Sequence, residues 1–253
     1  MEKIILLTND DGINAKGLMV LAEKLSGLGK VIVVAPDREQ SASSHAITLD
    51  APLRITEYSD VRYGVSGTPT DCVILAVHGL LKSRPDLIVS GINHGPNMGE
   101  DVTYSGTVAA AIEGNILGIN SLAISIASWD PKHFESAARA AKYLADKALS
   151  LKKDAKALWN INVPDLPIYK IKGYKITKLG SRIYNDVIIK KKDPRGKDYF
   201  WIGGGEPGWN KEKSTDFAAI SSGYISITPL RLDLTDYKSI VELKAKRFIW
   251  KVK

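Results

Sequence analysis

Short apolar runs alternate with helical patterns through the first half of the chain, and this alternation constrains the fold most strongly. Lys3–Leu7 and Lys30–Ala35 (KVIVVA) are rich in Ile, Leu and Val, as is typical of parallel strands buried on both faces of a sheet. Between them, residues Ala15–Leu28 repeat apolar side chains at helical spacing. These residues therefore predict a strand–helix–strand unit, whose two strands lie parallel in one sheet.

The same alternation continues to about residue 150. We expect further strands at Ile47–Thr56, Arg62–Val65, Leu87–Ser90 and Ser121–Ile126. We expect further helices at Pro69–Lys82, Thr107–Leu117 and His133–Leu151. This order predicts an α/β class protein, with a Rossmann-like, doubly wound core and a mostly parallel sheet over residues 1–150.

After Leu151 the pattern becomes mostly β. Strands or ribbon segments are expected at Ala157–Val163, Gly173–Leu179, Val187–Lys192, Tyr199–Ile202 and Gly223–Thr228. A closing helix is expected at Asp236–Phe248. No linker or repeat divides the chain, so we expect one domain over residues 1–253, with a β-rich C-terminal extension over residues 151–253.

Composition narrows the class of protein. The chain of 253 residues has no apolar stretch approaching the ~18 residues of a membrane span, and no signal peptide is recognisable. A single cysteine, Cys72, rules out an internal disulfide framework and a multi-cysteine zinc site. We therefore expect a cytoplasmic protein without a membrane partner.

Charge is unevenly distributed along the chain. Residues 1–150 hold 13 Lys and Arg against 17 Asp and Glu, whereas residues 151–253 hold 22 against 11. A basic half can bind nucleic acid or an anionic substrate, or it can be the lysine-rich solvated surface of a heat-adapted protein. The lysines are scattered without an RNA-binding signature, which favours the solvated surface, so no nucleic-acid partner is expected.

Polar side chains follow three of the predicted strands. Asn9, Asp10 and Asp11 come after the first strand, Ser41 lies just beyond the second, and Asn93 follows the third. Ligands of open parallel sheets bind at these carboxyl ends, so the side chains can converge on one edge. Carboxylate, hydroxyl and amide oxygens suit a hard cation such as Mg²⁺, Mn²⁺ or Ca²⁺. A simple turn, or a helix cap at Asp11, would also explain the acidic pair.

A second candidate site lies at the start of the helix near residue 107. Ser105, Gly106 and Thr107 stand where small residues open a helix, after the glycine-rich loop GINHGPNMGED. A helix start offers free backbone N–H groups and a positive dipole end, which bind anions, although ordinary capping also fits. His45 and His94 fall close to the two candidate sites, but neither has a partner beside it in the sequence.

Several long motifs resemble one family. NDDGI, VVAPDREQSASSHAIT, GTPTDCV, VSGINHGPNMGEDVTYSGTVAAAIEG and GYISITPL occur here in the order seen in the SurE (survival protein E) nucleotidase family. The resemblance runs from the first strand to GYISITPL and is weakest over Lys178–Lys213. It implies a Rossmann-like core whose C-terminal part is exchanged between the subunits of a homodimer, which in some members pairs into a homotetramer.

The resemblance also implies an activity. SurE proteins are metal-dependent phosphomonoesterases of nucleoside 5′- and 3′-monophosphates, and some remove phosphate from short polyphosphate. One divalent cation per subunit, Mg²⁺ or Mn²⁺, is bound by residues that match Asp10, Asp11, Ser41 and Asn93. The family's remaining site residues match Asn9, Asn97, Ser105, Gly106 and Thr107.

These matches predict residue roles. Asp10, Asp11 and Asn97 form the expected catalytic set, with an acid as ligand or as base for water, and Asn97 with the Ser105–Thr107 segment binds phosphate. Attack by Asp10 itself, through an aspartyl-phosphate, stays open. Two other classes are disfavoured. A receiver-type Mg²⁺-binding signalling domain needs an Asp after its third strand, and a nucleic-acid-binding module would show a steep salt dependence and no turnover.

Overall fold

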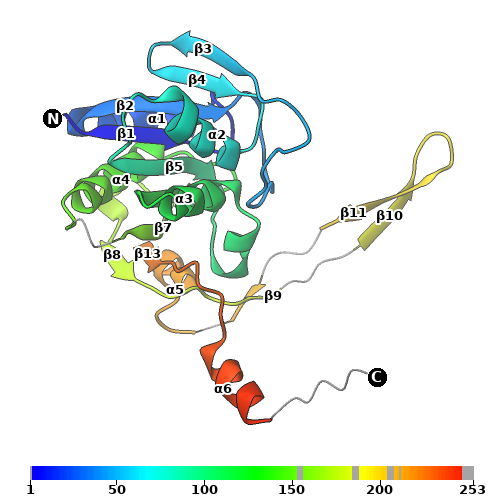
Figure 1. Cartoon of the computed structure of the whole chain (residues 1–253). Coiled ribbons are helices and arrows are strands. Elements are labelled where there is room, and N and C mark those ends of the chain that lie inside the picture. Colours follow the sequence, from blue (N-terminus) through cyan, green and yellow to red (C-terminus); the bar gives the residue numbers. More distant parts are fainter. Residues whose placement is uncertain (1, 153–155, 184–187, 204–207, 211, 247–253) are drawn as a thin grey trace.

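The computed structural model describes residues 2–152, 156–183, 188–203, 208–210 and 212–246. A nine-stranded sheet forms its centre (Figure 1). In spatial order its strands are β3 (Ile55–Ser59), β4 (Arg62–Val65), β2 (Lys30–Pro36), β1 (Ile4–Thr8), β5 (Leu87–His94), β6 (Asn120–Ile126), β7 (Leu158–Val163), β13 (Ile225–Pro229) and β8 (Tyr174–Ile176). The six strands from β4 to β7 are mutually parallel, whereas β3 and β13 run antiparallel to their neighbours β4 and β7.

Helices cover both faces of this sheet. The described α-helices are α1 (Lys16–Leu25), α2 (Pro69–Leu75), α3 (Gly106–Ile116), α4 (Phe134–Leu149), α5 (Asp216–Ser221) and α6 (Tyr237–Ala245), of which α6 does not cover the sheet. Helices α1 and α4 pack against each other and share one core with β1, β5 and β6. Helices α2 and α3 pack against the opposite face. The predicted doubly wound α/β fold with a mostly parallel sheet is confirmed.

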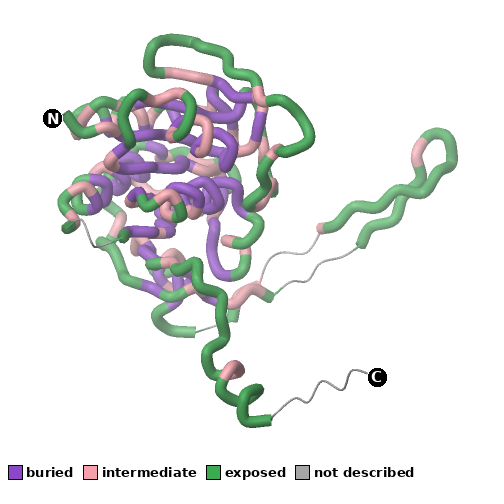
Figure 2. The backbone as a smooth tube through the Cα atoms, viewed as in Figure 1, coloured by how far each residue is buried: buried purple, intermediate pink, exposed green. Residues whose placement is uncertain are grey.

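Strand β1 shows how the sequence produces this arrangement. Ile5 and Leu7 join the core under α1 and α4, while Leu6 between them joins the core under α2. Successive side chains of a strand point to opposite faces, so a strand between two helical layers must be apolar at every position. The buried part of the tube in Figure 2 follows these central strands. Strand β1 ends at the edge of the sheet where Asp10 lies.

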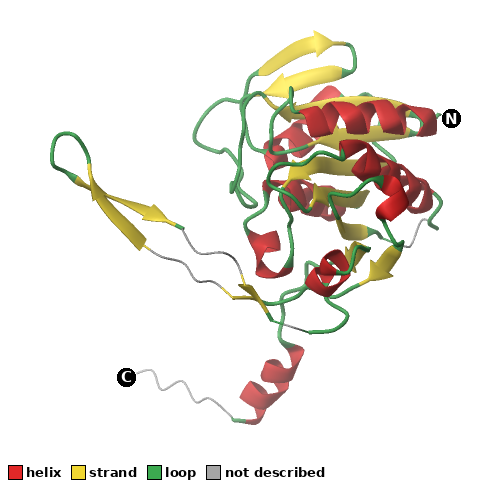
Figure 3. Cartoon of the chain, turned by 180° about the vertical axis from the view of Figure 1, so that it is seen from behind, coloured by secondary structure: helices red, strands yellow, loops and turns green. Residues whose placement is uncertain are grey.

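The second half of the chain adds two small ribbons. β10 (Ile188–Lys192) pairs with β11 (Asp198–Ile202) across the turn at residues 193–196, and β9 (Arg182–Ile183) pairs with β12 (Gly208–Trp209). The β10–β11 ribbon and α6 project from the body of the molecule (Figures 1 and 3). The expected β-rich C-terminal extension is therefore present.

Several predicted boundaries were wrong. Ile47–Thr56 is not a strand until Ile55, because Leu49 is exposed and the backbone N–H of Thr48 bonds to the Asp71 side chain rather than to a neighbouring strand. The helix expected over Pro69–Lys82 is α2 followed by a π-helical turn that ends at Leu80.

Other segments differ in length or were missed. β5 continues past Ser90 to His94, so Asn93 lies inside the strand, with a register shift against β6. The short helix α5, capped by Thr215, was not predicted, because six residues are too few to show helical periodicity. The last predicted helix begins as expected but ends at Ala245, with Lys246 as its C-cap, and residues 247–248 of the predicted range lie outside the described residues.

Short 3₁₀ helices η1 (Ser26–Leu28), η3 (Gly99–Thr103) and η4 (Ile168–Lys170) complete the described elements. In the part of the chain that the structure describes, no helix combines the length and the apolar character needed to cross a membrane.

Helix α3 lies unusually close to the sheet. A Cβ atom added to Gly114 would meet the hydroxyl of Ser121 and come within 2.6 Å of the Cδ1 atom of Ile88, both in fully buried residues. Because buried neighbours cannot move without leaving voids or clashes elsewhere, only glycine permits this approach. The approach fixes α3 so that its first turn reaches Asp10.

We predict that Gly114→Ala lowers the free energy of unfolding by about 1–3 kcal/mol, despite the better helix propensity of alanine. Gly79→Ala is the matched control, because a Cβ at Gly79 would meet no atom within 4 Å. The control should leave stability unchanged or raise it by up to about 1 kcal/mol. Denaturant titration of both variants measures the difference, and equal stability would contradict the close packing of α3.

Candidate active site

A cavity of about 360 Å³ opens at the carboxyl ends of the central strands. It is lined by Asp10, Ser41, Ala42, Asn93, Pro96, Asn97, Asp101, Tyr104, Ser105, Trp129 and Arg182. These residues come from the segments after β1, β2 and β6, from the end of β5 and the loop after it, and from β9. The edge predicted from the polar strand ends is therefore the edge that carries the cavity.

Asp10 is buried directly after β1. The Thr107 hydroxyl donates to its Oδ1 atom, and a Cβ on Gly106 would lie 3.0 Å from its Oδ2 atom, so the carboxyl group sits at the N-terminus of α3. Burial raises the pKa of Asp10, although hydrogen bonds from Thr107 and from the backbone at the helix start oppose the rise. The backbone carbonyl of Asp10 accepts from Gln40 N at 2.7 Å, which ties the loop after β2 to the site.

Asp11 is half-buried beside Asp10. Its Oδ2 atom is buried and has no hydrogen-bond partner within the described part of the chain. Burial first, and then repulsion from Asp10 and Glu39, raise the pKa of Asp11 to about 7, while the backbone N–H of His94 opposes the rise. Asp11 does not cap α1, because that helix begins at Lys16 with Ala15 at its N-cap.

The raised pKa of Asp11 predicts how the metal-free protein responds to pH. The unfolded carboxyl group ionises near pH 3.8 and the folded one near pH 7, so folding loses stability as the pH rises between these values. Asp11→Asn removes this loss. We predict that the variant melts at a higher temperature than the native protein at pH 8 and at a similar temperature at pH 4.

Thermal melts in the presence of EDTA at both pH values measure this difference. The Asp146→Asn variant, which replaces an exposed acid on α4, is the control and should melt like the native protein throughout. A melting temperature of Asp11→Asn below that of the native protein at pH 8 would contradict the unfavourable burial of this carboxylate.

Ser41 and Asn93 both line the cavity. The Ser41 hydroxyl donates to the Oε1 atom of Glu39 at 2.6 Å and is exposed to the cavity mouth. The Asn93 amide nitrogen donates to the carbonyl oxygens of Gly95 and His94, at 2.9 and 3.2 Å. Since both bonds use the nitrogen, the amide oxygen of Asn93 is the atom that suits a cation.

Asn97 is held by a network of buried amides. Asn162 accepts from the backbone N–H of Asn97 at 2.8 Å, and its own amide nitrogen donates to the Asn97 carbonyl at 2.9 Å. Asn160 donates to the same carbonyl at 2.8 Å, and the Asn97 side chain donates to the Ser125 hydroxyl at 2.8 Å. Both β7 asparagines are fully buried, so the loop that carries Asn97 is fastened to the sheet at a single residue.

We predict that Asn162→Leu destabilises the protein more than Asn160→Leu. Asn162 makes two hydrogen bonds to the Asn97 backbone and Asn160 makes one, and an unsatisfied buried N–H costs about 1–3 kcal/mol. Denaturant titration of the two variants compares the losses under the same conditions. A larger loss in Asn160→Leu would contradict the central place of Asn162 in the network.

The segment from Ser105 to Thr107 begins α3. Ser105 is the N-cap and accepts from Val108 N at 3.1 Å, which confirms the capping interpretation, while its side chain also lines the cavity. The Thr107 hydroxyl is engaged by Asp10. Asn9 donates to the carbonyl of Gly12 at 3.0 Å and so shapes the turn after β1, and its buried Oδ1 atom lacks a partner in the described structure.

The site residues suit a divalent cation. Buried oxygens of Asn9, Asp11 and Ser43 lack protein partners among the described residues, and such groups normally bind a ligand, an ion or water. No group of three or more His, Cys, Asp and Glu able to hold a metal ion occurs in residues the structure describes. The donors here are instead two carboxylates with a hydroxyl and an amide, the oxygen set that hard cations prefer.

Comparison with known proteins agrees with this geometry. The model of the family described as "Survival protein SurE" matches residues 5–186. The chain belongs to the SurE family. The "5′-nucleotidase SurE" of Pelobacter propionicus is 52% identical over 237 residues, which cover 93% of this chain and 96% of that protein. The protein of the same name from Geobacter sulfurreducens is 49% identical over 242 residues, covering 95% and 92%.

A solved structure supports the same conclusion. The crystal structure of a SurE protein from Aquifex aeolicus matches with a TM-score of 0.86 and 43% identity, over 97% of this chain and all of that one. The acidic pair therefore lies in a SurE fold and not in a receiver-type domain. The two histidines near the SurE site have other contacts: His45 Nε2 lies 2.9 Å from Glu113 Oε2, and the His94 ring packs on Phe134.

Several residues of the site were not predicted from the sequence. Asn160 and Asn162 alternate within LWNINV, and two asparagines on one face of a buried strand were the signal that could have identified them. Arg182 reaches the cavity from a weakly patterned segment, where its Nη1 atom donates to both oxygens of Asp101, at 2.5 and 2.6 Å. Trp129 follows β6 in a loop without a recognisable motif.

Buried Asp216 explains how that weakly patterned segment is held beside the site. Its carboxylate accepts from the backbone N–H of Gly99, in the loop between β5 and α3, and from that of Gly180, each at 2.9 Å. Burial raises the pKa of Asp216 in spite of these bonds. The C-terminal part of the chain is thus anchored to the loop that carries Asn97 and Asp101.

Proposed function

We propose that this protein is a 5′-nucleotidase, which hydrolyses nucleoside 5′-monophosphates to nucleoside and phosphate with the aid of a divalent cation. The observation that carries the proposal is the pair of adjacent carboxyl groups after β1: Asp10 lines the cavity, and the buried Oδ2 atom of Asp11 beside it has no hydrogen-bond partner among the described residues. The relatives named 5′-nucleotidase SurE, at about half identity over nearly the whole chain, support the same activity.

Asp10, Asp11, Ser41 and Asn93 would hold one divalent cation per subunit, Mg²⁺ or Mn²⁺. Their oxygens come from three different segments of the sheet edge, and the buried carboxyl groups lose their unfavourable charge when a cation is near. When bound, the cation supplies positive charge for the phosphate oxygens and lowers the pKa of a water molecule.

The remaining site residues bind and orient the phosphate. Asn97 projects from a loop fixed by buried amides, and a rigid donor loses little entropy on binding. Ser105, Gly106 and Thr107 form the N-terminus of α3, whose dipole favours anions, and the backbone N–H groups of Gly106 and Thr107 there hydrogen-bond to the Asp10 carboxyl group. Asn9 supports this arrangement by holding the turn after β1, through the hydrogen bond from its amide nitrogen to the carbonyl of Gly12.

Asp10, Asp11 and Asn97 form the proposed catalytic set. One of the two acids accepts a proton from the attacking water, and Asn97 holds the phosphate for attack in line with the departing ribose oxygen. The Thr107 hydroxyl fixes the Asp10 carboxylate through its hydrogen bond to Oδ1, so Asp11, with a buried and unpartnered oxygen, has the greater freedom to accept the proton.

Further properties extend this proposal. Hydrolysis of nucleoside 3′-monophosphates and of short polyphosphate, together with a cytoplasmic location, are expected from the family resemblance. We also propose a homodimer, because the protruding β10–β11 ribbon exposes Ile188, Phe200, Trp201 and Ile202 and α6 exposes Val241. Exposed apolar side chains of this number favour a protein contact, which light scattering after size exclusion would measure.

Phosphate release tests the proposed activity. We predict that the purified protein releases phosphate from a panel of 5′- and 3′-nucleoside monophosphates with Mn²⁺ or Mg²⁺, and that EDTA abolishes the release. Asp10→Asn should lower kcat by at least about a hundredfold, because it removes one negative ligand and one candidate base. The exposed Asp146→Asn variant is the control and should keep full activity.

Circular dichroism and a melting curve establish that Asp10→Asn remains folded. Turnover that survives EDTA treatment, or an Asp10→Asn variant as active as the native protein, would contradict the metal-dependent mechanism. Absence of turnover with every nucleotide and metal, from folded native protein, would overturn the nucleotidase proposal itself.

A further inference from the structure

Two exposed aromatic side chains stand at the mouth of the active-site cavity. Trp129 is 76% exposed and Tyr104 is 60% exposed, yet both line the cavity that Asp10 and Asn97 also line. Single exposed aromatic side chains are common on protein surfaces, but two that line one cavity offer large apolar faces to a ligand. Their placement beside a phosphate site therefore calls for a functional explanation.

Trp129 is held in one position despite its exposure. A Cβ on Gly95 would lie 2.6 Å from the Cε3 atom of Trp129, so the indole lies directly over the backbone of the loop between Asn93 and Asn97. The φ angle of Gly95 is +96°, a conformation that glycine adopts readily and other residues do not. One face of the indole is thus packed on the site loop, and its remaining surface is presented to the solvent and the cavity.

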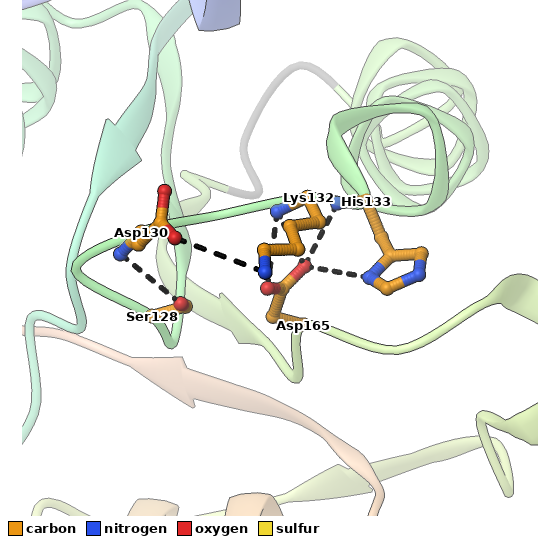
Figure 4. A network of polar contacts seen from close by, with 5 residues as sticks. All are labelled: Ser128, Asp130, Lys132, His133 and Asp165. Atoms are coloured by element: carbon orange, nitrogen blue, oxygen red, sulfur yellow. Dashed lines mark hydrogen bonds and ion pairs between the residues drawn. The ribbon is translucent and has the colours of Figure 1, made fainter.

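The loop that carries Trp129 is braced at both ends (Figure 4). Ser128 accepts from the backbone N–H of Asp130 at 3.3 Å, and the Asp165 carboxylate accepts from the backbone N–H groups of Lys132 and His133 and from His133 Nδ1. Burial raises the pKa of Asp165, but the hydrogen bonds lower it by more than burial raises it. The net pKa lies below the ordinary value, so the Asp165 carboxylate is ionised at neutral pH.

Tyr104 also lines the cavity and is fixed through its backbone. Its N–H donates to the carbonyl of Asp101 at 3.1 Å, and its own carbonyl accepts from Ser44 N at 3.1 Å. The next residue is Ser105, the N-cap of α3, so the phenol stands directly beside the proposed phosphate-binding helix start. Because Ser105, Asn97, Tyr104 and Trp129 line the same cavity, a ligand whose phosphate reaches Ser105 and Asn97 can place the rest of its surface against Tyr104 and Trp129.

We propose that Trp129 and Tyr104 form the binding surface for the nucleobase, by stacking on its π-face. The inference rests on the proposed nucleotidase function and specifies how that site recognises its substrate. Every base has a π-face, and stacking on aromatic side chains tolerates base identity. The surface therefore favours nucleotides over phosphate esters that lack a base, and it discriminates weakly among the four bases.

The test compares two substrates that differ only in the base. Kinetics with AMP and with ribose 5-phosphate, under saturating Mn²⁺, give the ratio of their kcat/KM values. Trp129→Ala is expected to lower this ratio about tenfold through a higher KM for AMP, with ribose 5-phosphate unchanged. Tyr104→Ala should act in the same direction, and Trp129→Phe, which keeps an aromatic face, should retain most of the ratio.

Tyr169→Ala is the matched control, because Tyr169 is 81% exposed and does not line the cavity. A ratio that Trp129→Ala leaves unchanged would overturn the nucleobase surface while leaving the nucleotidase function intact. An unchanged ratio together with an altered mass of the oligomer would assign Trp129 to a protein contact and would equally overturn the nucleobase surface. Native protein that hydrolyses neither substrate would overturn the proposed function, and the nucleobase surface with it.

Discussion

The site depends on one energetic constraint. Two carboxyl groups lie side by side, removed from water, at the end of one strand, and keeping both charges there costs free energy. Burial alone raises the pKa of Asp10, and burial together with the neighbouring charges raises the pKa of Asp11 to about 7. A protein retains such a pair only where something compensates the charge. The nearest compensation in the chain itself is the start of α3, where Thr107 and backbone N–H groups face Asp10. A cation completes the compensation of the negative charge.

The surrounding structure serves to hold this pair in place. Glycine at position 114 brings α3 against the sheet, so the helix start meets Asp10. Asn162 and Asn160 fasten the backbone of Asn97 to β7, and Asp216 fastens the same loop to the C-terminal part of the chain. Each of these contacts is buried, and each joins segments distant in the sequence. The floor of the cavity is therefore rigid, while its mouth carries exposed aromatic side chains on braced loops.

The sequence predicted the parts of this account that rest on local patterns. The strand-and-helix alternation identified the doubly wound core, and polar residues after three strands identified the edge where the cavity lies, because parallel strands end together. The extent of β5 was missed, since its last residues, Gly91 to His94, read as a glycine-rich loop. The stretch from Ile47 to Arg54 was mistaken for a strand, because its alternating pattern concealed contacts with Asp71 and Ser66.

Contacts between segments that are distant in the sequence could not be predicted from local patterns. Nothing in the local sequence indicates that Asn162 bonds to Asn97, that Asp216 accepts from Gly99, or that Trp129 lies over Gly95. Each contact depends on the completed sheet and on loops whose course is set by tertiary packing. The roles of individual residues at the metal and phosphate positions likewise rest on the family resemblance and on geometry together.

Calorimetric titration of Mn²⁺ into the metal-free protein tests the central claim most directly. Performed at pH 6 in two buffers with different ionisation enthalpies, it measures both the number of ions bound and the protons released. We predict one ion per subunit and release of about one proton, because Asp11 with a pKa of about 7 is mostly protonated at that pH. In Asp11→Asn, we expect neither the bound ion nor the released proton. Absence of saturable binding, or identical binding by Asp11→Asn, would show that the buried acidic pair is not a cation site.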